Sequence, residues 1–114
     1  MTVALMKAAA GNSILYVAGH TFAEFYRGGA RTAREAQLVK QWRPEVVEVG
    51  SDEGKLAGEL LAATRRANSM DALVVACATL HGIGEIYTTD PDDLRELCIH
   101  LPPGSARIDV VDVR

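Results

Sequence analysis

Short apolar segments with the character of β-strands alternate with longer segments of helical periodicity along this 114-residue chain. The short segments are rich in Val, Ile and Tyr, and residues such as Gly, Asn and Pro separate them from the helical ones. Strands that alternate with helices pair in parallel, because each helix carries the chain back across the sheet. We therefore predict an α/β fold with a parallel sheet between two layers of helices. A chain of this length supports one hydrophobic core, so residues 1–114 are predicted to form a single domain.

The predicted elements follow one another in a regular order. Strands are expected at residues 13–17, 45–49, 85–89 and 107–113, and helices at residues 20–27, 30–42, 52–66, 70–81 and 91–97. Residues 2–10 are predicted to form the end of a further helix, because their Ala-rich sequence runs into a Gly-Asn stop. The helix at 70–81 is apolar on most of its faces, which predicts that it is buried.

Composition excludes several classes of protein. Hydrophobic residues make up 48% of the chain and charged residues 24%, which is ordinary for a globular domain. No apolar run approaches the roughly 18–20 residues that cross a bilayer, and the first residues do not resemble a signal peptide. Cys77 and Cys98 form no paired metal-binding motif, so we expect a cytoplasmic protein. Basic residues are in excess only in residues 1–66, which excludes a uniformly basic nucleic-acid binder.

Three acidic residues fall near the ends of predicted strands. Glu24 follows the strand at 13–17, Asp71 begins the buried helix and Asp90 follows the strand at 85–89. Open parallel sheets bind ligands at the carboxyl ends of their strands, so these side chains are candidates for one site. Taken singly, Asp71 is explained by the dipole of its helix and Asp90 by an Asp-Pro turn. Glu24 is harder to explain, because it lies among apolar and aromatic residues where a carboxylate needs a partner or a metal.

Together the three acids suggest a site for a hard cation. Mg²⁺ takes oxygen ligands and uses a few carboxylates together with water and substrate phosphate. Such ions activate water and stabilise the leaving oxygen in phosphodiester cleavage. Thr88, or its neighbour in sequence, is a candidate to hydrogen-bond one of the carboxylates or to hold a water molecule.

Two segments resemble a known family. Residues 70–94 (MDALVVACATLHGIGEIYTTDPDDL) resemble the C-terminal half of a PIN domain, and more narrowly that of the VapC-type toxins of bacterial toxin–antitoxin pairs. Residues 22–28 (FAEFYRG) resemble the second acidic motif of the same family. The resemblance implies a PIN-like three-layer α/β/α fold, a ribonuclease activity that depends on Mg²⁺ or Mn²⁺, a cognate antitoxin protein as partner, and a homodimer.

The resemblance also implies roles for individual residues. Glu24, Asp71 and Asp90 would be metal ligands and catalytic residues, and Asp93 would be a further ligand. A basic segment that includes Arg27 and Arg31 would contact RNA phosphates or an acidic segment of the antitoxin. The alternative for these arginines is an ordinary solvated helix face.

The chain departs from the family pattern at its beginning. The family starts with a central strand that carries a first Asp, whereas no Asp precedes Asp52 in this sequence. Without that strand, two strand edges in the middle of the sheet would be left unpaired, which favours pairing with another chain. Three explanations stay open: a start site placed too far downstream, a truncated gene, or a dimer that completes the sheet.

Three functional hypotheses follow from the sequence. The first is an endoribonuclease toxin that hydrolyses RNA with a metal-activated water molecule. The second is a truncated, non-catalytic PIN-like domain that acts in dimerisation or antitoxin binding. The third is an unrelated α/β regulatory domain of the receiver type, which would need a paired acidic motif after its first strand; we find no such motif in the sequence.

Overall fold

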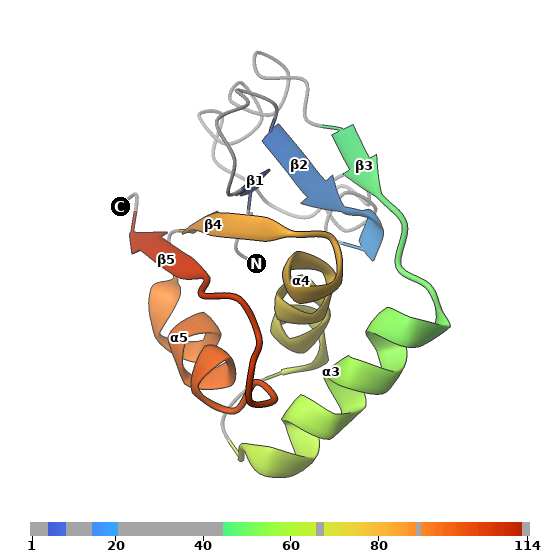
Figure 1. The fold of residues 1–114 in the computed structure, drawn as a ribbon, viewed down its shortest axis with the longest axis vertical. Coiled ribbons are helices and arrows are strands. Elements are labelled where there is room, and N and C mark those ends of the chain that lie inside the picture. Colours follow the sequence, from blue (N-terminus) through green and yellow to red (C-terminus); the bar gives the residue numbers. More distant parts are fainter. Residues whose placement is uncertain (1–4, 9–14, 21–44, 66–67, 89, 113–114) are drawn as a thin grey trace, which may run out of the picture.

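The computed structural model describes residues 5–8, 15–20, 45–65, 68–88 and 90–112 (Figure 1). The strands are β1 (Leu5–Ala8), β2 (Leu15–Ala18), β3 (Glu45–Val47), β4 (Ile83–Thr88) and β5 (Asp109–Asp112), and the helices are α3 (Ser51–Ala63), α4 (Ser69–Leu80) and α5 (Pro91–Ile99). The predicted helix at 30–42 and all but the start of the one at 20–27 lie outside the described residues. So do the candidate site residues Glu24, Arg27 and Arg31.

The five strands form one sheet in the order β3-β2-β1-β4-β5. The outer pairs are parallel as predicted: β2 with β3, and β4 with β5. The central strand β1 instead runs antiparallel to both of its neighbours, and Met6 pairs with Tyr16 on one side and with Ile86 on the other. The α/β class is therefore confirmed, with an antiparallel strand at the centre of an otherwise parallel sheet.

The prediction of a helix over residues 2–10 is wrong, because Leu5–Ala8 is a strand. Its Ala-rich sequence favours a helix locally, but position in the sheet overrides that preference. Met6 is completely buried between two other strands. The inner edges of β2 and β4, which we expected to be unpaired, are both covered by this segment of the same chain.

The described helices lie on one face of the sheet (Figure 1). Helix α4 is the central one, and six of its residues are buried: Ala72, Val74, Val75, Ala76, Cys77 and Ala78. These side chains are small, so α3 approaches α4 closely and packs Ala57 and Leu60 against it. The prediction of a buried helix at 70–81 is confirmed, and Cys77 is part of the core.

The helix ends follow local sequence signals. The side chain of Asn68 caps α4 by accepting a hydrogen bond of 2.8 Å from the backbone N–H of Asp71. Gly82 follows the C-cap residue His81 of α4 and has a φ of 69°, a left-handed conformation that glycine adopts without strain. Pro91 occupies the first position of α5, where its missing N–H costs nothing. No helix among the described residues is long and apolar enough to cross a membrane.

Candidate functional site

Three acidic side chains gather at one edge of the sheet. Strands β2 and β4 are both antiparallel to β1, so they point the same way and end at the same edge. Helix α4 begins there and carries Asp71 in its first turn. Asp90 follows β4, and Asp93 lies in the first turn of α5. Asp71, Asp90 and Asp93 therefore belong to segments that begin or end at the same edge of the sheet.

The charges of these residues influence one another. Burial, together with the negative charges of Asp93 and Asp90, raises the pKa of Asp71 to about 6. Across the part of the chain that the structure describes, no Lys or Arg forms an ion pair with any of the three carboxylates. The site thus concentrates negative charge and leaves its carboxylate oxygens available to a ligand.

Two backbone contacts hold the acidic segments in place. The hydroxyl of Thr88, which is almost fully buried, accepts a hydrogen bond of 3.1 Å from the backbone N–H of Asp90. His20, directly after β2, places its Nε2 atom 2.8 Å from the carbonyl oxygen of Met70. Since Met70 precedes Asp71 in the chain, this contact attaches the first turn of α4 to the end of β2.

We expected the hydroxyl of Thr88 to hydrogen-bond a carboxylate or to hold a water molecule. In the structure it accepts from the backbone N–H of Asp90, and its own proton remains free to donate. The contact still restrains the loop that positions this acid. The anchoring role of His20 was not predicted, because nothing in the sequence near position 20 or 70 indicates that the two residues meet.

The donor chemistry of the site fits a hard divalent cation. Mg²⁺ is commonly bound through one or two carboxylates plus water, and Asp71, Asp90 and Asp93 supply such oxygens. The raised pKa of Asp71 reflects repulsion and burial that a bound cation would relieve. Among the described residues, however, no three acidic, His or Cys side chains are close enough together to hold an ion by themselves. Glu24, the further ligand expected from the sequence, lies outside the described residues.

A family comparison covers nearly all of these elements. The model of a family described as PIN domain matches residues 2–99. The chain belongs to the PIN domain family. The match begins before β1 and ends with α5, so it includes every described element except β5. No curated protein and no solved structure matches the chain.

Membership of this family bears on both fold and chemistry. The PIN-like α/β fold predicted from the sequence is confirmed by the match together with the parallel outer strand pairs and their covering helices. PIN domains are nucleases in general and depend on divalent metal ions, so a nuclease-type function on nucleic acid is indicated for this PIN domain. The acidic edge of the sheet is the part of the described chain that suits that chemistry.

Proposed function

We propose that this PIN domain is an endoribonuclease that depends on Mg²⁺ or Mn²⁺ and that serves as the toxin of a toxin–antitoxin pair. One observation carries the proposal. Burial and the negative charges of Asp93 and Asp90 raise the pKa of Asp71, which begins α4 at the edge of the sheet where β2 and β4 end. Carboxylates held together against their mutual repulsion, with no cationic partner among the described residues, are typical of a metal site.

Each residue has a defined part in the proposed reaction. Asp71, Asp90 and Glu24 hold the metal ion, and Asp93 is available as a further ligand. When bound, Mg²⁺ or Mn²⁺ supplies a water molecule of lowered pKa and stabilises negative charge on the phosphodiester. Thr88 keeps the loop of Asp90 in position through its hydrogen bond. Arg27 and Arg31 contact RNA phosphates, which fixes the backbone of the substrate over the acids.

The toxin role is supported by the sequence. Residues 22–28 and 70–94 resemble the corresponding segments of VapC-type toxins. The arginines at positions 27 and 31 also suit an acidic segment of an antitoxin. We propose a homodimer acting in the cytoplasm, with RNA as substrate and a cognate antitoxin as protein partner.

A second candidate function is a PIN-like domain without catalysis. One observation favours it: among the described residues, no three acidic, His or Cys side chains lie close enough together to hold a metal ion. Such a domain would bind a second copy of itself or an antitoxin without cleaving RNA.

Cleavage of a mixed RNA substrate by the purified chain decides between the two. The reaction is run with and without Mn²⁺, beside Asp71→Asn and the matched control Asp92→Asn, whose side chain is exposed on α5. Cleavage that needs Mn²⁺, is lost in Asp71→Asn and survives in Asp92→Asn supports the nuclease. A wild-type chain that unfolds cooperatively but cleaves nothing supports the non-catalytic domain.

A further inference from the structure

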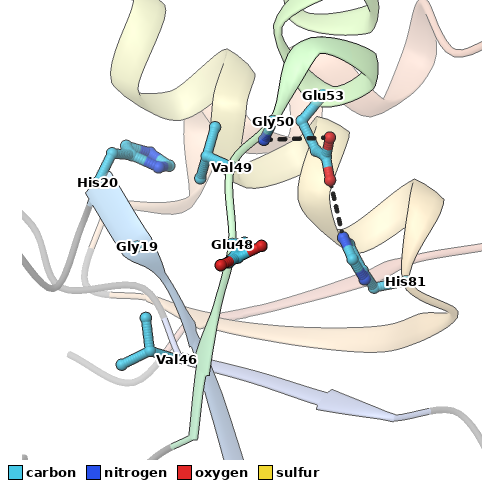
Figure 2. Close-up of a pocket in the computed structure, with 8 residues that line it drawn as sticks. All are labelled: Gly19, His20, Val46, Glu48, Val49, Gly50, Glu53 and His81. Atoms are coloured by element: carbon cyan, nitrogen blue, oxygen red, sulfur yellow. Dashed lines mark hydrogen bonds and ion pairs between the residues drawn. The ribbon is translucent and has the colours of Figure 1, made fainter.

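A pocket lies between the ends of β2 and β3, the start of α3 and the end of α4 (Figure 2). Its volume is about 720 Å³. The side chains that define it among the described residues are two carboxylates, two imidazoles and two valines: Glu48, Glu53, His20, His81, Val46 and Val49. None of the three acids of the candidate nuclease site lines it.

Glu53 provides a fixed negative charge in this pocket. Only 9% of the residue is exposed. One carboxylate oxygen accepts from the Gly50 N–H at 3.3 Å, and the other accepts from Nε2 of His81 at 2.9 Å. The bond from His81, with those from backbone N–H groups, keeps the pKa of Glu53 below its usual value, so this carboxylate is ionised at neutral pH.

Glu48 adds a second carboxylate at the same pocket. Its side chain is exposed, and no described residue donates a hydrogen bond to it or forms an ion pair with it. Figure 2 places it between His20 and the Glu53–His81 pair. No described Lys or Arg is paired with Glu53 either. The pocket therefore carries negative charge that a cationic group from outside the described chain can neutralise.

Apolar surface lies beside these charges. Val46 is 48% exposed, a large fraction for a valine next to a pocket, and Val49 is half-buried. A guanidinium group on an aliphatic stem suits this combination, because the stem covers apolar surface while the planar head forms two hydrogen bonds to a carboxylate. RNA does not suit it, since the two glutamates repel phosphate.

Among the described strands, the one next to the pocket has a neighbour on one side only. Strand β3 lies at the end of the sheet and pairs with β2 on one side, and no other described strand pairs with it. Such an edge accepts an extended segment through backbone hydrogen bonds. We propose that a partner protein adds an extended segment alongside β3 and places an arginine side chain in the pocket formed by Glu48 and Glu53. This inference does not depend on the proposed nuclease function.

The test uses a short blocked peptide, acetyl-Thr-Val-Arg-Val-Thr-amide, as the probe. Its matched control carries citrulline in place of arginine, which keeps the shape and removes the charge. Binding to the full 114-residue chain is followed by shifts of backbone amide NMR signals. The arginine peptide is expected to shift the signals of Val46, Glu48 and Gly50, and the citrulline peptide to bind about tenfold more weakly.

Substitutions locate the site on the protein. Glu48→Gln is expected to weaken binding of the arginine peptide about fivefold or more, and Glu59→Gln to leave it unchanged because Glu59 is an exposed residue of α3 that does not line the pocket. Glu48 is exposed, so its replacement leaves the fold intact. Equal binding of the two peptides, no binding at millimolar peptide, or shifts of the same signals by single-stranded RNA would overturn the proposal.

Discussion

The Nε2 atom of His20 lies 2.8 Å from the carbonyl oxygen of Met70. A carbonyl oxygen only accepts hydrogen bonds, so the imidazole carries a proton on Nε2 and donates it. Burial lowers the pKa of His20, which favours the neutral ring with this tautomer. The contact joins the end of β2 to the residue before Asp71, so the geometry of the acidic edge depends on this histidine.

Replacing this histidine should loosen the acidic edge. In His20→Phe, an aromatic ring is kept but the bond to Met70 is lost, and we expect the free energy of unfolding to fall by about 1 kcal/mol. The pKa of Asp71 should also move toward its usual value as the first turn of α4 shifts. Urea unfolding measures the first effect and carboxylate NMR the second. His100→Gln, at an exposed helix end, serves as the control; a pKa of Asp71 that stays unchanged in His20→Phe would contradict the anchoring role.

Asp71 should destabilise the fold in the absence of metal. Its pKa is raised from 3.8 to about 6, so folding with an ionised carboxylate is unfavourable at neutral pH. Solvent reaches part of the side chain and screens the repulsion, so Asp71→Asn should raise the free energy of unfolding by about 1 kcal/mol at pH 7. Added Mg²⁺ should stabilise the wild type and leave the variant unchanged, as measured by thermal unfolding.

The effect of Asp71→Asn on the free energy of unfolding should depend on pH. The folded state takes up a proton at Asp71 more readily than the unfolded state, so the unfavourable contribution is present above pH 6. It fades as the pH falls through 6 and is gone below the ordinary pKa of 3.8. The stability difference between Asp71→Asn and the wild type should therefore shrink on acidification. A difference that is constant over this range would show that the pKa of Asp71 is not raised in the folded state.

Thr88 offers a test of how the loop of Asp90 is held. Thr88→Val keeps the shape of the side chain and removes the oxygen that accepts from the Asp90 N–H. We expect a loss of about 1 kcal/mol in stability and a roughly tenfold loss in Mn²⁺ affinity. Thr88→Ser keeps the hydroxyl and should keep the Mn²⁺ affinity, although it loses a buried methyl group. Manganese titration by electron paramagnetic resonance measures both variants, and equal affinities in the two would argue against this role.

The Glu53–His81 contact should make part of the free energy of unfolding depend on pH. The pKa of Glu53 is lowered in the folded state, so its contribution is fully present above the ordinary value of 4.5. That contribution is lost as the pH falls below this value and the carboxylate is protonated. Glu53→Gln should therefore be less stable than the wild type at pH 7 and approach it in acid. A double-mutant cycle with His81→Ala separates the pair from the other contacts of each residue.

Much of the fold could be predicted from local sequence. The helices at 52–66, 70–81 and 91–97 match α3, α4 and α5 to within a few residues, because helix periodicity and the Gly82 and Pro91 signals lie within or next to the segments themselves. Strand β1 could not be predicted in this way. Nothing in Leu-Met-Lys-Ala favours a strand over a helix, and its conformation depends on two strands that lie elsewhere in the chain.

In the candidate site, too, the sequence predicts the positions of some residues but not the contacts between others. The positions of Asp71 and Asp90 follow from the order of strands and helices, since that order places both residues at one edge of the sheet. The contacts of His20 with Met70, and of Glu53 with His81, depend on how helices rotate and pack against their neighbours. No spacing within the sequence encodes them. The assignments of Glu24, Arg27 and Arg31 stay predictions.

The central position of β1 has a consequence for the order in which the chain folds. Leu5 in β1 pairs with Tyr87 in β4. About 80 residues of chain must therefore be synthesised after β1 before this pair of strands can form. During translation β1 and β2 can pair as soon as both have left the ribosome, but the other edge of β1 stays open until β4 follows. Contacts between such distant parts of a chain slow folding. One edge of β1 therefore stays unpaired from the synthesis of β1 until that of β4, and this is the period in which aggregation or a chaperone competes with the native sheet.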